Sequence, residues 1–592
     1  MNNMTQKDAL KELLKRIKKY WYMLLLSVVF ATAYVILSLY IPKLIGLGTD
    51  RIIGQGKVDF VGLKGVILQI VVCTMIAAVG WWIMGLCNNK ITYNVIRDIR
   101  KEAFDKIQKL PVSYIDSKAS GDIVNNVITD VDQLADGLLM GFSNLFTGVI
   151  TILFTLIFMI QIDLKIALVV ICVTPLSFFV ASFIAKRTYS MFRVQSEIRG
   201  EQTGIVDETL SGLKVVKAFG QEDSILENFD DTNDRLWKVN VKATFFSSIT
   251  NPSTRFVNNI VYALVAIFGG LEAVIAKGIT VGGLMTILSY ANQYTKPFNE
   301  ISGVITELQN AIACSARVFS LINEEEIVDV KESEETVLKN VDGSIGIDNV
   351  NFSYDKDKEL IKDLNLHVKP GQRVAIVGPT GCGKTTIINL LMRFYDVDSG
   401  KITVDNRNIT DITRKSLREN YGMVLQETWL QKETIADNIA FGKTDATREE
   451  IIEAAKQSHA HSFIKRLPKG YDTVIGEDGG SLSQGQKQLL CIARVMLALP
   501  PMLILDEATS SIDTRTEIRI QKAFNKMMKG RTTFIVAHRL STIKEADIIL
   551  VMNNGKIIEQ GNHQQLLEQK GFYYNLYNSC LLYTSPSPRD CS

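Results

Sequence analysis

The chain has 592 residues, enough for two or three domains, and 47% of them are hydrophobic. The mean hydropathy of +0.12 is too high for an ordinary soluble protein of this length, so part of the chain is expected to lie in lipid. A net charge of +2 argues against a nucleic-acid-binding protein. The eight cysteines show no CxxC pairing, so we predict neither a disulfide framework nor a zinc site.

The N-terminal segment, residues 1–20, is basic. Its cations are Lys7, Lys11, Lys15, Arg16, Lys18 and Lys19. Because positively charged flanks of membrane spans remain on the cytoplasmic side, we predict a cytoplasmic N-terminus.

Apolar runs follow this segment. A helix needs about 20 apolar residues to cross the hydrocarbon core of a bilayer. Four runs meet this length without difficulty: residues 22–45, 66–87, 138–160 and 166–185. Two more, residues 243–276 and 279–301, contain a few charged residues and are also predicted to span. We therefore expect a six-helix transmembrane domain over residues 21–314.

The connections after the second and fourth spans, residues 88–137 and 186–242, are long, polar and rich in Lys and Arg. With the N-terminus inside, both are predicted to be cytoplasmic extensions. Four amides near the last two spans are candidates for a substrate cavity, with hydrogen bonding between helices as the alternative. They are Asn258, Asn259, Asn292 and Gln293.

An acidic stretch, residues 315–342, is predicted to be a linker. Beyond it, β-branched runs at residues 373–377, 502–505 and 533–536 alternate with helical patterns, which predicts a soluble α/β domain with a mainly parallel sheet over residues 343–579. Residues 580–592 have no periodicity; they resemble translated sequencing-adapter read-through, with a short disordered terminus as the alternative.

A phosphate-binding loop lies directly after the first of these strands. Its residues fit the pattern GxxxxGK[ST]: Gly378, Pro379, Thr380, Gly381, Cys382, Gly383, Lys384 and Thr385. Backbone N–H groups of such a loop surround phosphates, the lysine bridges them, and the Thr385 hydroxyl reaches Mg²⁺. With Thr386 in the same helical turn, we predict an ATP site.

A second motif places two carboxylates at the end of the strand at residues 502–505. We expect Asp506 to hold Mg²⁺ and Glu507 to orient and deprotonate the attacking water. An acidic pair in this position is otherwise often a helix cap, but the preceding phosphate loop favours the Walker B interpretation.

Residues 482–486 read LSQGQ, and here the sequence resembles the ATP-binding-cassette (ABC) family, whose signature is LSGGQ at the start of a helix. Other positions follow in the order typical of that family. They are Tyr354, Gln426, Gly476-Glu477, Ser511-Ile512-Asp513 and His538. The resemblance implies a membrane all-α domain of six helices followed by an α/β P-loop nucleotide-binding domain.

The resemblance also implies roles for single residues. Tyr354 would stack on adenine, Gln426 would sense Mg²⁺ and the γ-phosphate, and His538 would contact the γ-phosphate during hydrolysis. Asp513 would lie at the seam of a dimer. Three signature residues would face the nucleotide bound by the opposite chain: Ser483, Gly485 and Gln486. A complete site would therefore need a second half-transporter.

The membrane half adds a separate resemblance. Residues 110–116, 121–123, 208–212 and 216–219 with Glu222 look like intracellular loops of ABC exporters, which carry short coupling helices that dock on the cassettes. Taken without that resemblance, the same stretches read as solvated amphipathic helices.

One position departs from the family pattern: Gln484 stands where the signature has Gly, while Glu507 is intact. This combination resembles one subunit of heterodimeric bacterial multidrug exporters, whose partner has LSGGQ and lacks the catalytic Glu. A homodimer that tolerates Gln484 is the alternative.

The family resemblance implies ATP-driven export of amphipathic small molecules across a bacterial cell membrane, from the cytoplasm or the inner leaflet. A lipid or glycolipid flippase has the same architecture and remains the first alternative; a membrane-bound regulator or gated channel is another. Expected partners are a second half-transporter, membrane lipid and a small amphipathic substrate, but no nucleic acid.

Overall fold

The structure is a computed structural model that describes residues 4–52, 58–276, 278–355, 358–425, 428–476, 479–480, 482–506, 512–536 and 543–584. The chain forms two compact units. The first, the helical unit, is Met1–Leu110 with Lys118–Glu325, and the second, the cassette unit, is Pro111–Ser117 with Glu326–Ser592.

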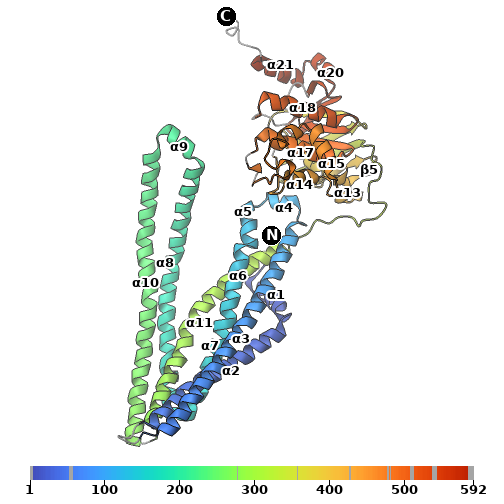
Figure 1. The fold of residues 1–592 in the computed structure, drawn as a ribbon. Coiled ribbons are helices and arrows are strands. Elements are labelled where there is room, and N and C mark those ends of the chain that lie inside the picture. Colours follow the sequence, from blue (N-terminus) through green and yellow to red (C-terminus); the bar gives the residue numbers. More distant parts are fainter. Residues whose placement is uncertain are drawn as a thin grey trace. The chain divides into compact units, whose positions relative to one another are not determined.

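The helical unit is built from long helices (Figure 1). In chain order these are α1 Gln6–Lys18, α2 Trp21–Asp50, α3 Phe60–Ile107, α5 Ser120–Val127, α6 Thr129–Met140, the π-helix η1 Gly141–Leu145, α7 Phe146–Ile162, α8 Leu164–Ser211, α9 Leu213–Phe219, α10 Glu222–Leu271, the π-helix η2 Glu272–Ala276 and α11 Val281–Ile322. Helices suit this composition because lipid offers no hydrogen-bond partners to an exposed backbone.

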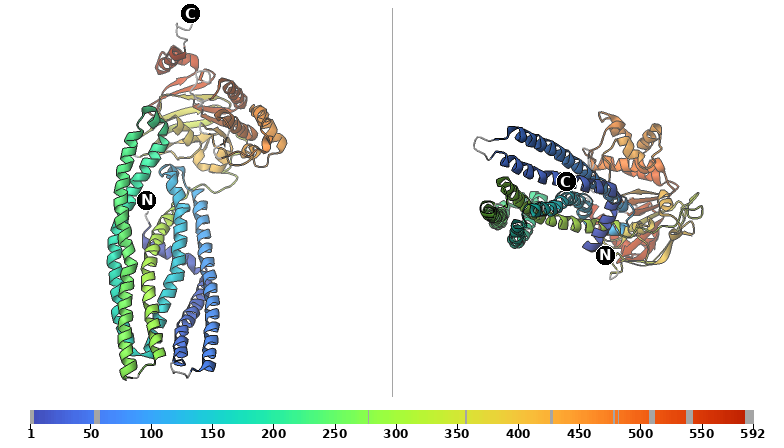
Figure 2. Two further views of the ribbon diagram at one scale, coloured as in Figure 1. Left: turned by 60° about the vertical axis from the view of Figure 1, so that its left-hand side comes forward. Right: turned by 90° about the horizontal axis from the view of Figure 1, so that it is seen from below.

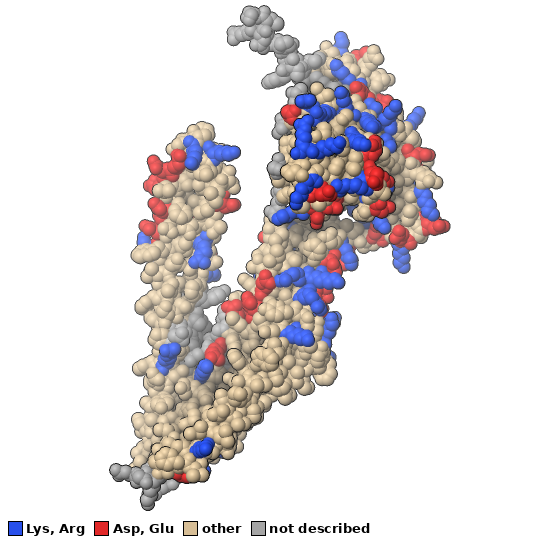
Figure 3. Space-filling view, in the orientation of Figure 1, with Lys and Arg blue, Asp and Glu red and all other residues tan. Residues whose placement is uncertain are grey.

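Among the described residues, four helical stretches are long and apolar enough to cross a membrane: Trp21–Asp50, Phe60–Ile107, Ser120–Ile162 and Glu222–Ile275. They contain the first, second, third and fifth predicted spans. The fourth lies in α8, where Leu164–Pro175 counts as a shorter apolar helix, and the sixth lies in α11. Figure 3 shows long parts of these helices free of charged side chains.

Helices α8 and α10 run side by side as a long hairpin with α9 at its tip (Figures 1 and 2). We call α8, α9 and α10 the arm. Many large apolar side chains on the part of the arm near α9 are exposed, among them Leu210, Phe219, Leu226 and Trp237. This is the second predicted cytoplasmic extension, and its apolar surface lacks cover within the helical unit.

Helices α2 and α11 cross closely at two glycines. A Cβ atom on Gly46 would lie 2.4 Å from the carbonyl oxygen of Gly282, and one on Gly282 would lie 2.0 Å from that of Gly46. The Tyr290 hydroxyl of α11 donates to the Leu39 carbonyl of α2 at 2.7 Å. Small residues at such crossings let membrane helices pack backbone against backbone.

Helix α11 differs from the sequence prediction at its C-terminal end. It continues to Ile322, so residues 315–322 are helical and the linker starts later than predicted. The physical reason is apolar burial: Val318, Phe319 and Leu321 are fully buried, and the Arg16 guanidinium of α1 lies 4.5 Å from the Phe319 ring centroid. The nearby acidic residues mask this apolar face in the sequence.

The cassette unit contains two sheets. A six-stranded sheet has the order β10-β9-β3-β8-β7-β6, in which β10 alone runs antiparallel, and a four-stranded antiparallel sheet has the order β2-β1-β4-β5. The strands are β1 Ile345–Phe352, β2 Ile361–Val368, β3 Arg373–Val377, β4 Ser399–Val404, β5 Arg407–Asn408, β6 Tyr421–Val424, β7 Met502–Asp506, β8 Thr532–Val536, β9 Ile548–Asn553 and β10 Lys556–Gly561.

The helices of the cassette unit that bear on the site are α4 Val112–Asp116, α12 Lys384–Leu391, α13 Arg414–Glu419, α17 Gln484–Ala498 and α18 Thr514–Met528. Others are α14 Ile435–Ala440, α15 Arg448–Gln457, α16 His461–Ile464, α20 His563–Glu568 and α21 Phe572–Thr584. Helix α21 extends into the predicted tail as far as Thr584, and residues 585–592 lie outside the described part.

Both faces of the six-stranded sheet are buried. On β3, Ala375 and Val377 face a core shared with α17 and α18, while Val374 and Ile376 face a core shared with α12 and the antiparallel sheet. This explains the continuous apolar runs in the sequence, because a parallel sheet covered on both sides has no solvated face. The three predicted strands are confirmed as β3, β7 and β8.

Candidate functional site

The phosphate loop, residues 378–383, connects β3 to the N-terminus of α12. Gly378 must lack a side chain, because a Cβ atom there would lie 2.3 Å from the Met552 carbonyl oxygen and 2.7 Å from the Cys382 sulfur. Gly383 has φ +101°, which L side chains rarely adopt. The loop can therefore take this path only with glycine at both positions.

Lys384 folds back over this loop. Its Nζ donates to the carbonyl oxygens of Gly378 and Pro379, each at 2.9 Å. The Cys382 thiol beneath it is buried, while Thr385 is exposed at the first turn of α12 and Thr386 points into the core. The loop thus presents a cation, backbone N–H groups, the Thr385 hydroxyl and a helix N-terminus together, which is the chemistry that phosphate oxygens need.

The register of the sheet aligns the ends of its strands. Asp506 of β7 pairs with Val536 of β8, and Ile376 of β3 pairs with the same Val536. The Asp506 carboxylate therefore lies at the carboxyl ends of the parallel strands, where the phosphate loop begins. Hydroxyl and carboxylate oxygens such as those of Thr385 and Asp506 are the donors that Mg²⁺ prefers.

Three predicted catalytic residues, Glu507, His538 and Gln426, lie outside the described residues. In the sequence Glu507 directly follows β7, while His538 and Gln426 come two residues after the ends of β8 and β6. The roles of these three residues therefore remain predictions. Glu477 and Ser511 of the supporting motifs also lie outside the described residues.

The signature segment starts α17. Ser483 is the N-cap: its hydroxyl accepts from the Gln486 N–H at 3.3 Å, and the Gln486 side chain accepts from the Ser483 N–H at 3.0 Å. This capping box fixes the helix N-terminus, whose positive end can bind an anion. Gly485 is buried against the start of α18, where a Cβ atom would lie 2.5 Å from the Thr516 methyl group.

Asp513 is the N-cap of α18, accepting from the Thr516 N–H at 2.9 Å. Hydrogen bonds from Thr516 lower the pKa of its carboxyl. The structure thus brings Gly485 together with residues 512–516. The Gln484 side chain is exposed and donates to the Thr428 hydroxyl at 3.3 Å, beyond the end of β6.

The signature segment and the phosphate loop stand at different places along the sheet. Strand β6 is separated from β3 by β7 and β8, a distance of about 14 Å at the usual strand spacing. The cassette of one chain therefore does not place Gln484 beside its own phosphate loop.

Tyr354 is held beside the phosphate-loop helix by an aromatic cluster. Its hydroxyl accepts from the Asn389 side chain of α12 at 2.9 Å, and its ring meets Phe352 and Tyr395 edge to face with centroids 4.9 Å away in both cases. The residue is nonetheless 49% exposed, which leaves area for a stacked base.

Tyr395 also contacts helix α4, which belongs to the cassette unit although it lies between α3 and α5 in the sequence. The Tyr395 hydroxyl donates to Asp116 at 2.5 Å, and burial together with this bond raises the pKa of the phenol. Tyr114 of α4 is buried as well. The predicted docking of residues 110–116 on the cassette therefore has a direct contact in this structure.

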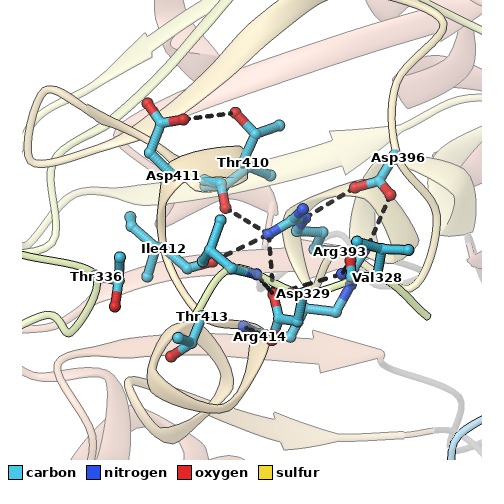
Figure 4. A network of polar contacts seen from close by, with 12 residues as sticks. Val328, Asp329, Thr336, Arg393, Asp396, Thr410, Asp411, Ile412, Thr413 and Arg414 are labelled. Atoms are coloured by element: carbon cyan, nitrogen blue, oxygen red, sulfur yellow. Dashed lines mark hydrogen bonds and ion pairs between the residues drawn. The ribbon is translucent and has the colours of Figure 1, made fainter. Parts of the chain in front are cut away.

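Linker residues Val328 and Asp329 are fixed to the cassette by a network of polar contacts (Figure 4). Arg414 donates to the Val328 carbonyl at 2.7 Å and to Asp396 at 2.6 Å, and its backbone N–H donates to Asp329 at 2.9 Å. Arg393, whose side chain is buried, donates to Asp396 at 2.8 Å. Tyr395 thus contacts α4, and its neighbour Asp396 contacts Arg414, which holds the linker.

Comparison with known proteins decides the family. Residues 24–298 match the ABC transporter transmembrane region, and residues 361–510 match the ABC transporter family. A fatty acid ABC transporter ATP-binding/permease protein of Mycobacterium bovis is 41% identical over 529 residues, covering 89% of this chain and 83% of the relative. The chain belongs to the ABC transporter family.

Two further similarities concern exporters and flippases. An ATP-dependent lipid A-core flippase of Syntrophus aciditrophicus is 34% identical over 516 residues, covering 87% of this ABC transporter and 85% of the relative. The solved structure of a bacterial Atm1-family ABC exporter with ATP bound matches with a TM-score of 0.78 and 28% identity, covering 97% and 99% of the two chains. The fusion of a helical transmembrane domain with an ATP-binding cassette is thereby confirmed.

Tyr395, Asn389 and the network around Asp396 are residues that sequence reasoning missed. In the sequence Tyr395 reads as one more aromatic residue after an apolar helix, and its partner Asp116 is 279 positions away. No local pattern in this ABC transporter signals that contact, since only the folded cassette brings Tyr354, Tyr395 and Asp116 together.

Replacing Tyr395 with Phe removes the bond to Asp116 and keeps the aromatic cluster. We expect substrate transport per ATP hydrolysed to fall about fivefold while ATP affinity is unchanged, because a partly exposed hydrogen bond to a charge contributes on the order of 1 kcal/mol. Tyr421→Phe is the matched control, since the buried Tyr421 hydroxyl has no hydrogen-bond partner among the described residues. The same amount of substrate transported per ATP in both variants would contradict a role of the Tyr395 hydroxyl in linking ATP hydrolysis to transport.

Proposed function

We propose that this chain is one subunit of a heterodimeric exporter that uses ATP hydrolysis to move amphipathic small molecules out of the cytoplasm or the inner leaflet. The observation behind the proposal is that the phosphate loop with Lys384 and the Asp506 carboxylate lie together at the carboxyl ends of the parallel strands. The same chain has helices long and apolar enough to cross a membrane. Such a chain can couple nucleotide chemistry to a movement in the membrane.

In the proposed reaction Lys384, the loop N–H groups and the N-terminus of α12 bind the phosphates of ATP. Thr385, Asp506 and Gln426 would hold Mg²⁺, which neutralises charge on the β- and γ-phosphates. Glu507 would take a proton from the water that attacks the γ-phosphorus, and His538 would contact the γ-phosphate. Tyr354 would stack on the adenine through its exposed face.

A second chain completes the site. The signature helix N-terminus at Ser483 lies about three strand positions from the phosphate loop of its own cassette, so its anion-binding end is available to nucleotide on another cassette. The exposed apolar side chains near α9 give a second reason, because an apolar surface outside the membrane is normally covered. ATP would favour the closed pair of cassettes, and hydrolysis would release it.

The heterodimer rests on Gln484. Its side chain occupies the first position of α17, where the family signature has glycine and where backbone would approach the partner's nucleotide. The site containing Gln484 would therefore be slow. The competent site would combine Lys384, Asp506 and Glu507 of this chain with an LSGGQ signature from a partner that lacks the catalytic Glu.

Purification of this chain alone tests the pairing. We expect ATPase activity at least about tenfold below that of the chain mixed with its partner, because both composite sites of a homodimer would contain Gln484 and neither would have an LSGGQ signature. Gln484→Gly should restore part of the activity of the single chain. Full activity of the unmodified chain as a homodimer would contradict the heterodimer and leave the exporter proposal intact.

For the membrane topology, we propose a bacterial cell-membrane protein with residues 1–20 and the cassette in the cytoplasm. An amphipathic cargo suits the relatives, one named for fatty acid and one for lipid A-core. The second of these also supports a flippase as the alternative. Cargo that moves between leaflets of a vesicle without reaching its lumen would favour the flippase.

A further inference from the structure

The helical unit has a partly open cavity of about 510 Å³ lined by α2, α3, α11 and the η1–α7 segment. The volume is in the range of pockets that bind a single drug-sized molecule. One wall is aromatic: the rings of Tyr34 and Trp81 have centroids 6.4 Å apart, and Trp81 is 59% exposed. The cavity can therefore accept an apolar body.

Another part of the lining is charged. Lys296 and Glu300 of α11 both line the cavity, with Nζ and Oε1 3.7 Å apart. Lys296 is about 22 Å along α11 from its start at Val281, which under the proposed topology lies within the hydrocarbon layer of about 30 Å. Ionisable residues at such depth are costly and are usually functional.

This pair is poorly arranged for a structural role. Their separation is longer than a hydrogen bond, and the order Lys before Glu at four residues is the weaker orientation on a helix. The Lys296 side chain is 75% exposed and that of Glu300 is 48% exposed. The ammonium group, more than the carboxylate, is therefore open to a ligand.

The remaining polar lining consists mainly of hydroxyl and amide side chains. Ser143 and Asn144 come from the π-helical turn η1, a type of turn that is frequent at functional sites, and Gln293 precedes Lys296 on the same helix. These hydroxyls and amides can donate hydrogen bonds to the oxygen atoms of a carboxylate, sulfonate or phosphate, but they can also accept, and Thr147 and Thr151 already donate to Met84 and to the Thr147 carbonyl. The preference for an anion therefore comes from Lys296, which can only donate.

From these features we infer that this cavity binds amphiphiles with an anionic head group, which pairs with Lys296 while the apolar part lies against Tyr34 and Trp81. The inference rests on the proposed export function and names the substrate class of its cavity. Of the four amides predicted from sequence as cavity candidates, Gln293 is the one in this lining, and Asn144 is an amide that the sequence did not point to.

The test is ligand binding to the full chain in nanodiscs, together with its partner chain if it needs one. Hexadecanesulfonate serves as the anionic probe, with hexadecanol, hexadecyltrimethylammonium and hexadecylphosphocholine as neutral, cationic and zwitterionic probes. The readout is the change in Trp81 fluorescence in a variant whose other four tryptophans are replaced by Phe. Butanesulfonate tests whether the anion alone binds. We expect the hexadecanesulfonate to bind most tightly and butanesulfonate not to bind.

Three variants locate the effect. Lys296→Gln should weaken hexadecanesulfonate binding about tenfold and remove its advantage over hexadecanol, since a charge-assisted hydrogen bond is lost. Glu300→Gln should leave the affinity equal or higher. Lys165→Gln is the control, because Lys165 also pairs with a glutamate in the helical unit, Glu272 at 3.2 Å, but does not line the cavity.

Equal affinity for all four long-chain probes, tightest binding of the cationic or zwitterionic probe, or no effect of Lys296→Gln would each overturn the inference. Measuring ATP-driven transport into vesicles distinguishes failure of the anion-site inference from failure of the export proposal. Transport that does not depend on Lys296 would leave export standing without the anion site. Lys296-dependent binding without any ATP-driven movement would support the site and contradict export.

Discussion

Replacing Glu507 with Gln is expected to lower ATP hydrolysis by about 10²–10⁴-fold, because the variant loses the general base and keeps the shape of the side chain. ATP binding should persist, since Lys384 and the phosphate loop are untouched. The measurement is phosphate release by the active pairing of chains, together with the affinity for a fluorescent ATP analogue.

Glu449→Gln is a suitable control for this experiment, because Glu449 is an exposed carboxylate in the first turn of α15 and belongs to none of the nucleotide-site motifs. Its activity should equal that of the unmodified chain. If Glu507→Gln retains more than about half of the turnover, the assignment of Glu507 as the base is wrong.

Truncating Lys384 to Ala is expected to weaken ATP binding about a hundredfold, since the loop then lacks the cation that faces the phosphates and charge-assisted hydrogen bonds contribute about 1.5–3 kcal/mol each. Hydrolysis should fall with binding. In this structure the Lys384 ammonium is held by two loop carbonyls, so it is already placed over the phosphate position.

The matched control is Lys401→Ala, which removes an exposed lysine of the same domain that lies 3.5 Å from Asp348. Thermal unfolding of both variants shows whether the loop remains folded. An unchanged ATP affinity for Lys384→Ala would mean that nucleotide binds elsewhere in the chain.

Local sequence patterns predicted the framework of the site well. The strand at residues 373–377, the glycine-rich loop and the following helix occur where expected, because β-branched runs, glycines with positive φ and a helix start all act over a few neighbouring residues. The helix start at the signature segment, which the family resemblance implied, also occurs where expected, at Gln484. Chemistry confined to adjacent residues can be predicted from a sequence.

Contacts between distant segments could not be predicted. Asp116 meets Tyr395, Arg414 meets Val328 and Asp329, and α11 continues through residues 315–322 because its apolar face packs on α1. Each depends on how the chain folds back on itself. The acidic composition after residue 323 also concealed the end of α11, since composition averages over residues with different surroundings.

The cavity shows the same limit within the helical unit. The sequence pointed to amides near the last two spans, and the folded helices place Gln293 next to Ser143, Asn144 and Trp81 from other helices. A charged pair at Lys296 and Glu300 looked in the sequence like an interruption of a membrane span. Its position in the cavity lining suggests a reason for these charges, namely the binding of an anionic head group by Lys296.

Accumulation of a fluorescent anionic amphiphile in inside-out vesicles is the measurement that most directly tests ATP-driven export by paired chains. The account predicts uptake into the lumen that needs ATP and both chains, and that is lost with Glu507→Gln although ATP still binds. Uptake that proceeds equally without ATP, or full ATPase activity from a single water-soluble copy of the chain, would contradict it.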